Sequence, residues 1–197
     1  MLNKLMTKTE VEEFLKGKGD FVQIDHLTRM IKTSKSSIPR DVLKFIYLKL
    51  SEIYEKKNMY AEAARMNDAA AAYAMKFSEK INYFVKEAEL FIKAGQFDRA
   101  DEAVRKSFSE ASASERANIA FQIKEFYKKQ AATYEKEVRR GNAMKIYEKL
   151  LNMKIADDER VEIKKRLLEM YEKLGKVREW MELSGGRFLA ERKMRVE

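Results

Sequence analysis

One short pattern returns four times along this 197-residue chain, and it restricts the possible folds more than any other feature. In each copy a small residue or leucine is followed three residues later by an aromatic one, then by a polar turn, and then by an apolar residue that opens a second segment. The copies are SEIYEKKNMYAEAA from Ser51, AELFIKAGQFDRAD from Ala88, AATYEKEVRRGNAM from Ala131 and LEMYEKLGKVREWM from Leu168. Units of this kind bury their apolar faces by stacking on one another, which predicts a solenoid.

The spacing of apolar residues predicts that these units are helical. They recur at steps of three and four almost throughout, as in the run Val42, Phe45, Ile46, Leu50 and Ile53. Such spacing places them on one face of an α-helix. Only one proline and seven glycines interrupt the chain, and no segment alternates as a half-buried strand does. The sequence therefore predicts an all-α fold.

The repeats can be set in register by placing their starts at Lys44, Ile81, Lys124 and Val161, which gives steps of 37, 43 and 37 residues. The predicted repeats are residues 44–80, 81–123, 124–160 and 161–184, within a repeat domain of residues 39–184. We expect the longer middle step to come from a helix extended through residues 114–123, with Ser112 or Ser114 as its N-cap.

Turns between the paired helices are predicted at three polar or glycine positions, Asn58, Gly95 and Gly175. In the copy that begins at Ala131 the turn is less clear, because Gly141 comes later than the turn residue of the other copies.

This pattern resembles the tetratricopeptide repeat and its SNAP-like relatives, which share the order aromatic, turn, aromatic and alanine. The resemblance covers about residues 41–184. The residues that carry it are Leu50, Tyr54, Tyr60, Ala63, Ala88, Phe91, Gly95, Phe97, Ala100, Tyr127, Ala131, Tyr134, Ala143, Tyr147, Leu168, Tyr171, Gly175 and Val177. It implies a right-handed α-α superhelix of about four to five helical hairpins. The chain departs from the family in its longer period, in lacking the closing proline of each repeat, and in having Trp180 where alanine is usual.

The two ends differ from the repeats. Residues 1–38 are predicted to form a degenerate hairpin or cap, with helices at Thr9–Lys16 and Phe21–Thr33. A loop at Ser34–Pro39 follows, and Asp41 is a candidate N-cap for the next helix. After Gly185 and Gly186, residues 185–197 are predicted to form a short basic helix or tail.

Two sets of cations recur in register on the first helix of each repeat. The resemblance implies that these helices line a concave face where partners dock. The sixth residues of the four repeats are all cationic, and the thirteenth are all lysines. We call them the sixth-position cations (Lys49, Lys86, Lys129 and Arg166) and the thirteenth-position lysines (Lys56, Lys93, Lys136 and Lys173). With Asn82, they are the candidate partner-binding residues of a basic groove for an acidic segment or a chain terminus.

The same cations have a second interpretation, as members of helix-stabilising pairs. Glutamate precedes several of them by four residues, the favourable order, and each such pair contributes about 0.2–0.5 kcal/mol. The predicted pairs are Glu52–Lys56, Glu89–Lys93, Glu125–Lys129, Glu162–Arg166 and Glu169–Lys173. The sequence leaves both interpretations open.

Composition argues against several kinds of chemistry. The chain has no cysteine and a single histidine, His26, so a thiolate site or a histidine-rich metal site has no ligands. Carboxylates are numerous, but almost all have a basic neighbour at helical spacing, which indicates a solvated face. We therefore predict no catalytic residue, no metal, no cofactor and no enzymatic activity.

These features predict a protein–protein interaction scaffold or adaptor whose basic groove binds an acidic or terminal peptide, with Phe45, Leu48, Val85 and Ile92 as apolar anchors. The alternative is a protein that binds RNA or a ribonucleoprotein, since the net charge is +9. The basic residues Arg187, Arg192, Lys193 and Arg195 favour that alternative. Self-association through the end repeats is a further possibility. No apolar run reaches the length of a membrane span, so a cytoplasmic location is expected.

Overall fold

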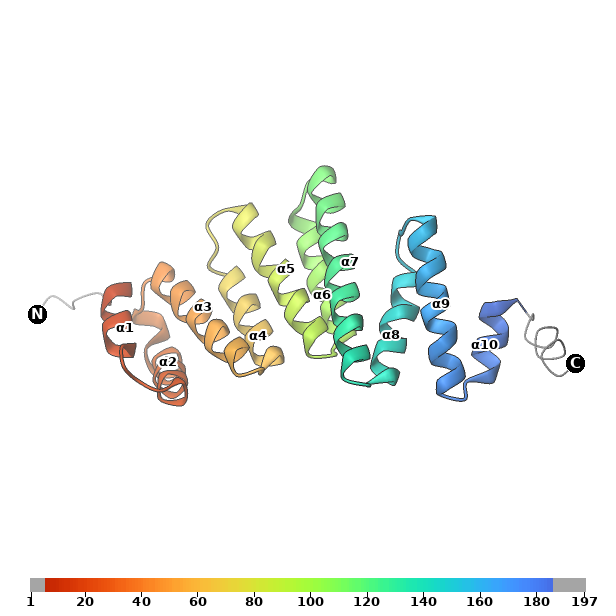
Figure 1. The fold of residues 1–197 in the computed structure, drawn as a ribbon. Helices are drawn as coiled ribbons and strands as arrows, with labels where there is room; N and C mark the ends of the chain where they lie inside the picture. The colour runs from red at the N-terminus through yellow and green to blue at the C-terminus, as the bar shows by residue number, and fades with distance from the viewer. Residues whose placement is uncertain (1–5, 186–197) are drawn as a thin grey trace, which may run out of the picture. The chain divides into compact units, whose positions relative to one another are not determined.

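The structure, a computed structural model, describes residues 6–185. This part of the chain forms ten α-helices and one 3-10 helix and contains no strand, which confirms the predicted all-α class (Figure 1). The helices are α1 (Lys8–Leu15), α2 (Asp20–Ser34), η1 (Lys35–Ser37), α3 (Arg40–Lys56), α4 (Tyr60–Ala71), α5 (Phe77–Lys93), α6 (Phe97–Glu110), α7 (Ala113–Lys136), α8 (Arg140–Leu151), α9 (Asp157–Lys173) and α10 (Val177–Ser184). The basic tail predicted from Arg187 onward lies outside the described residues.

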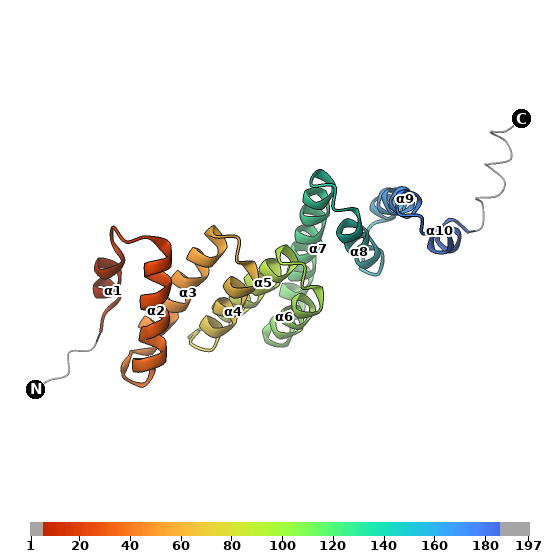
Figure 2. The same cartoon turned by 90° about the horizontal axis from the view of Figure 1, so that it is seen from below.

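Two compact units, Met1–Ile123 and Lys124–Glu197, divide the chain, and the boundary between them falls within α7. In the first unit α3 packs on α4, α4 on α5 and α5 on α6, while α1 and α2 pack against α3. In the second unit α8 packs on α9, and α9 on α10. Within each unit the contacts therefore run mainly between helices that follow one another in sequence, as Figure 2 shows for α3, α4 and α5.

Four turns join the paired helices α3/α4, α5/α6, α7/α8 and α9/α10, and all four have one backbone conformation. At each turn one residue has a left-handed φ, between 59° and 72°. The residue after it donates its backbone N–H to the carbonyl of the repeat's aromatic residue, five positions earlier, over 2.8–2.9 Å. This is the Schellman arrangement, which satisfies carbonyls at a helix end. The left-handed residues are Asn58, Gly95, Val138 and Gly175, and the accepting aromatic residues are Tyr54, Phe91, Tyr134 and Tyr171.

These turns confirm the three predicted turn residues and settle the unclear one. Val138, with φ of 59°, occupies the left-handed place in the α7/α8 turn, and Gly141 lies one residue inside the start of α8. A β-branched side chain is strained in this conformation, so the sequence offered no turn signal there. The four left-handed residues are separated by 37, 43 and 37 residues, the steps set for the repeats.

The alanine expected in the second helix is fully buried in three hairpins, at Ala63, Ala100 and Ala143. Opposite Ala63, the buried Ser51 of α3 donates its hydroxyl to the Ala63 carbonyl over 3.0 Å. A small side chain on each helix lets the two backbones approach this closely. In α10 the same position holds Trp180, which is partly exposed.

The long helix that accounts for the 43-residue step is α7, which has 24 residues. Ser112 caps its start: the Ser112 hydroxyl accepts from the backbone N–H of Glu115 over 3.4 Å, and the Glu115 carboxylate accepts from the backbone N–H of Ser112 over 2.8 Å. This reciprocal pair is a capping box, so Ser112, rather than Ser114, is the N-cap.

The N-terminal pair of helices agrees with the sequence, apart from one cap. The helices α1 and α2 begin and end within one residue of the predicted bounds, and Gly17 between them has φ of 75°. The predicted loop at residues 34–39 contains η1. The prediction that Asp41 caps α3 was wrong, because Pro39 is the N-cap and Asp41 lies in the first turn, where its carboxylate is 3.1 Å from Lys8.

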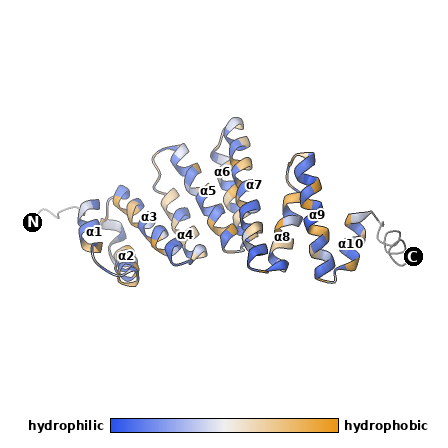
Figure 3. Cartoon of the chain, viewed as in Figure 1, coloured by the Kyte–Doolittle hydropathy of each residue, from blue (hydrophilic) through white to orange (hydrophobic). Residues whose placement is uncertain are grey.

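Tyrosines fill much of the core. Tyr47, Tyr127, Tyr134, Tyr147 and Tyr171 are all buried. Every labelled helix carries hydrophilic residues beside hydrophobic ones, which is the amphipathic pattern expected of paired helices (Figure 3).

Candidate functional site

The eight predicted cations lie on the first helices of the four hairpins, four in each compact unit. The helices α3 and α5 of the first unit carry Lys49, Lys56, Lys86 and Lys93. The helices α7 and α9 of the second unit carry Lys129, Lys136, Arg166 and Lys173. Each group is described within its own unit.

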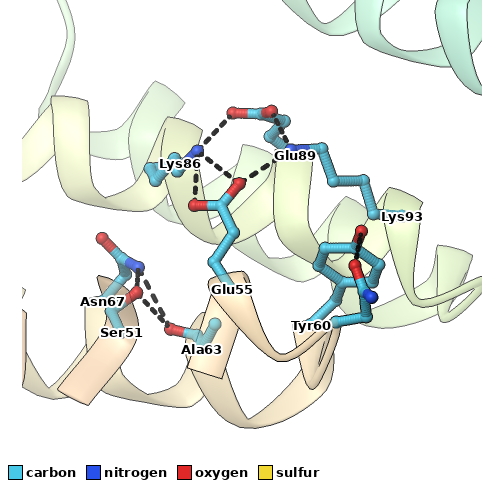
Figure 4. A network of polar contacts seen from close by, with 9 residues as sticks. Ser51, Glu55, Tyr60, Ala63, Asn67, Lys86, Glu89 and Lys93 are labelled. Carbon is cyan, nitrogen blue, oxygen red and sulfur yellow. Dashed lines mark hydrogen bonds and ion pairs between the residues drawn. The ribbon is translucent and has the colours of Figure 1, made fainter. Parts of the chain in front are cut away.

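In the first unit two of the cations belong to a closed network between neighbouring hairpins. We call Glu55, Lys86, Glu89 and Lys93 the first-unit quartet (Figure 4). The ammonium of Lys86 lies 3.0 Å from Glu55 and 3.0 Å from Glu89. The ammonium of Lys93 lies 2.8 Å from Glu55 and 2.7 Å from Glu89. Two carboxylates thus neutralise two ammonium groups, and Glu55 ties α3 to α5.

The pKa shifts in the first-unit quartet have the directions expected of such a network. Burial alone would raise the pKa of Glu55, but hydrogen bonds from Lys93 and Lys86 hold it below its usual value. Burial alone would lower the pKa of Lys93, but hydrogen bonds to Glu55 and Glu89 raise it. Glu55 and Lys93 are therefore both charged at neutral pH. The ammonium groups of Lys86 and Lys93 can bind a partner only if ion pairs of the network break.

The other predicted residues of the first unit are Lys49 and Lys56, which make ion pairs, and Asn82. Lys49 pairs with Glu52 over 2.8 Å, and Lys56 lies 3.1 Å from Asp20 of α2. Asn82 is exposed on α5 and makes no side-chain hydrogen bond to the described residues. All four predicted cations of the first unit therefore have carboxylate partners within that unit, and Asn82 lies one helical turn before Lys86 on α5.

The second unit is different, because only one of its four predicted cations makes an ion pair with the residues that the structure describes. Arg166 lies 3.0 Å from Glu135 of α7 and 2.8 Å from Glu162 of α9. Lys129, Lys136 and Lys173 are exposed and make no ion pair within residues 6–185. Of the predicted cations, Lys129, Lys136 and Lys173 could thus meet a partner without breaking an ion pair among the described residues.

A pocket of about 380 Å³ adjoins one of these lysines. The turn between α7 and α8 forms one side of this second-unit pocket, and one face of α9 forms the other. Its lining residues are Glu135, Val138, Arg140, Glu162, Lys165, Arg166, Glu169, Met170 and Lys173. Arg140 and Lys165, like Lys173, make no ion pair within the described residues. The lining thus has four cations and three carboxylates, of which Glu135 and Glu162 bind Arg166, so the pocket has a net charge of +1.

Sequence reasoning missed Arg140, Lys165 and Val138 as pocket residues. Arg140 and Lys165 do not recur in register, so a search for repeated cations passes over them. Val138 projects into the pocket only because it occupies the turn, and it is 61% exposed. The 43-residue step could have identified Val138, because it places the turn between α7 and α8 at that residue.

Two of the five predicted helix pairs are present. Glu89–Lys93 spans 2.7 Å and Glu162–Arg166 spans 2.8 Å. In the other three cases the partner differs or is lacking: Glu52 binds Lys49, Glu125 binds Lys128, and Glu169 has no ion pair in the described residues. Ion pairs also join neighbouring hairpins, and the spacing of charged residues within one helix cannot predict them.

One pair between hairpins is repeated in both units. The first residue of a repeat, Lys44 or Lys124, binds the glutamate just before the next repeat, Glu79 over 2.6 Å or Glu159 over 2.8 Å. Hydrogen bonds from Lys124 and Lys128 lower the pKa of Glu159 to about 2. These pairs show that the same hairpin-to-hairpin contacts are used twice.

Two of the predicted apolar anchors are not available. Val85 and Ile92 are buried in the core of the first unit, 8% and 1% exposed, so the expectation that they contact a partner was wrong. Helix α5 packs on α4 and α6, and this packing covers both side chains. Phe45 and Leu48 on α3 are partly exposed.

His26 is packed rather than ligating. Its ring stacks on Phe14 with centroids 3.4 Å apart, and burial lowers its pKa. Among the described residues no group of three or more histidine, cysteine or acidic side chains is placed to hold a metal ion. Within residues 6–185 no helix is both long and apolar enough to cross a bilayer.

Comparison with protein-family models gives no match, and comparison with curated proteins gives none either. We therefore infer function from the arrangement of charges and from the second-unit pocket.

Proposed function

We propose that this protein is a non-enzymatic interaction scaffold whose hairpins form a tetratricopeptide-like right-handed superhelix, and that it binds an acidic segment of a partner protein. Support for the fold comes from the four identical helix–turn–helix junctions and the buried alanines Ala63, Ala100 and Ala143. Support for an acidic partner comes from the free cations of the second unit. The proposed setting is the cytoplasm, where a chain without cysteine loses nothing to the reducing conditions.

The observation that carries the proposal is the second-unit pocket. It combines cations that make no ion pair within the described residues with the exposed side chain of Val138, and the buried Met170 also lines it. Cations beside an apolar surface suit a peptide in which acidic and apolar residues alternate. Steering by these charges would speed the encounter, and the apolar contact would slow release.

A protein partner is favoured over nucleic acid by the state of the aromatic rings beside cations. Arg139 lies over the ring of Tyr134, and Lys149 lies over the ring of Tyr127. Both rings are buried, 2% and 1% exposed, so neither can stack on a base. RNA binding beside these two rings would therefore depend on phosphate contacts and would fall steeply with salt.

The test compares two charge-reversed variants. The first changes Lys129, Lys136 and Lys173 to glutamate, and the control changes Lys145, Lys154 and Lys164, which are exposed lysines of the same unit. Both have the same net charge. We expect the first to lose binding to a glutamate- and leucine-containing peptide and the control to keep most of it. Equal binding by both variants, or preference for a single-stranded RNA over the peptide, would contradict the proposal.

A further inference from the structure

The first-unit quartet has a counterpart at the same repeat positions in the second unit. Glu135, Arg166, Glu169 and Lys173, the second-unit quartet, occupy the places of Glu55, Lys86, Glu89 and Lys93. The first contact is the same in both, since Glu55–Lys86 and Glu135–Arg166 each span 3.0 Å. Beyond that contact they differ, because Lys93 has two carboxylate partners and Lys173 has none within the described residues.

Two substitutions between the repeats account for this difference. In the first unit Asn67 of α4 turns inward and donates to Ser51 and to the Ala63 carbonyl, so it leaves Glu55 free to reach both lysines. In the second unit the equivalent residue is Tyr147, whose hydroxyl donates to Glu135 over 2.7 Å. One carboxylate oxygen of Glu135 is thus held by Tyr147 and the other by Arg166.

The second substitution acts on the arginine. Glu162 binds Arg166 over 2.8 Å, whereas the equivalent residue beside Lys86 is Asn82, which bears no charge. Arg166 is therefore drawn toward Glu162 and Glu135. Lys173 is left at the second-unit pocket, where Glu169, four residues earlier on α9, is the lining carboxylate that Arg166 does not bind.

From this comparison we infer that Lys173 and Arg166 form a recognition position for a side-chain carboxylate of the partner, which would take the bridging role that Glu89 has between Lys86 and Lys93. The inference rests on the proposed function and specifies its site. The carboxylate would lie beside Val138 and Met170, so the neighbouring partner residue is expected to be apolar. Arg140 and Lys165 supply further positive charge on the pocket wall.

Glu169 is the internal competitor for Lys173. A Glu169–Lys173 pair at this helical spacing would contribute only about 0.3–0.5 kcal/mol, so a partner carboxylate that is also held by apolar contact can outcompete Glu169. Removing the Glu169 charge is therefore expected to strengthen binding. This gain distinguishes a specific position from general attraction, which any loss of negative charge in the unit would increase equally.

The experiment is an NMR titration of the full chain with a capped peptide of alternating glutamate and leucine, with its glutamine analogue as the control ligand. We expect the largest amide shifts at Val138, Gly141 and Met170, around the second-unit pocket. Lys173→Ala should weaken binding about fivefold or more, while Lys136→Ala, the same change at the equivalent place on α7, should weaken it less than about twofold. Glu169→Gln should tighten it about twofold, and Glu172→Gln, the matched control, should change it less.

Two results would overturn the inference in different ways. If the acidic peptide binds but Lys173→Ala and Lys136→Ala are equally affected, the carboxylate position is wrong while the scaffold proposal stands. If the acidic peptide binds no better than its glutamine analogue, the acidic-partner proposal fails together with the site. A folding defect would weaken binding of the peptide, so it cannot produce the tighter binding expected of Glu169→Gln.

Discussion

The hydroxyl of Tyr147 on α8 donates a 2.7 Å hydrogen bond to the carboxylate of Glu135 on α7. The same carboxylate binds Arg166 of α9, so one glutamate ties together three helices of the second unit. Burial and this bond raise the pKa of Tyr147 to about 12, so the phenol keeps its proton and remains a donor at neutral pH. Both oxygens of Glu135 thus accept hydrogen bonds, one from Tyr147 and one from Arg166, and Glu135 makes no ion pair with Lys173.

The first prediction concerns Glu55, which joins α3 to α5. Glu55→Gln would leave Lys86 and Lys93 with Glu89 as their one shared acidic partner, and the site is only partly exposed. We expect the free energy of unfolding to fall by about 1–2 kcal/mol. Glu52→Gln, which removes a well-exposed partner of Lys49, should cost less than about 0.5 kcal/mol. Urea denaturation measures both, and equal losses would contradict the ranking.

A second prediction follows from the strained turn between α7 and α8. Val138→Gly should raise the free energy of unfolding by about 0.5–1 kcal/mol, because relief of left-handed strain exceeds the added entropy of glycine. The reverse change, Gly175→Val, should lower it by about 1–2 kcal/mol. A Cβ at Gly175 would meet nothing within 4 Å, so strain alone would cause that loss. Should Val138→Gly prove destabilising, contacts of the valine side chain would outweigh the strain.

The helices could be predicted from the sequence because their signals are local. The aromatic residues, the turn glycines and the alanines each report on their own hairpin, and Gly95 and Ala100 were placed correctly for that reason. The ion pairs of individual lysines could not be predicted as well. Whether Lys93 is bound and Lys173 free depends on Asn67 and Tyr147, which lie on other helices far away in the sequence. Burial of Val85 and Ile92 likewise depends on which neighbours α5 acquires, since a helix packed on both sides has little free apolar face.

The buried carboxylate of Glu87 leads to a prediction about pH. Burial raises its pKa to about 7 and outweighs Lys106, whose ammonium lies 3.1 Å away; Asp68 and Glu102 also raise it. The unfolded chain has the ordinary value of 4.5, so between pH 4.5 and 7 the folded state holds a proton that the unfolded state has released. Stability should therefore fall as pH rises through this window. Glu87→Gln should flatten that decline in urea denaturation curves, and an unchanged slope would show that Lys106 keeps Glu87 ionised.

Buried alanines set the spacing of the paired helices, which leads to a packing prediction. Ala100 of α6 is fully buried, so Ala100→Leu must force extra atoms into a filled space. We expect a loss of about 1–3 kcal/mol in unfolding free energy. Ala72→Leu, at an exposed position after α4, should change it by less than about 0.5 kcal/mol. Thermal denaturation of both variants measures these losses. If Ala100→Leu costs no more than Ala72→Leu, the two helices of this hairpin can move apart to accommodate the larger side chain.

The central claim is that Lys93 is held by two carboxylates in the first unit, whereas its equivalent Lys173 makes no ion pair within residues 6–185. Hydrogen exchange of lysine ammonium protons, followed by NMR on the protein labelled at lysine Nζ, tests it most directly. Protons of Lys86 and Lys93 should exchange slowly, since each ammonium is held by two carboxylates, and those of Lys136 and Lys173 should exchange too fast to detect. Tyr147→Phe should release Glu135 to reach Lys173 and slow its exchange. Equal exchange at Lys93 and Lys173, with no response to Tyr147→Phe, would contradict the account.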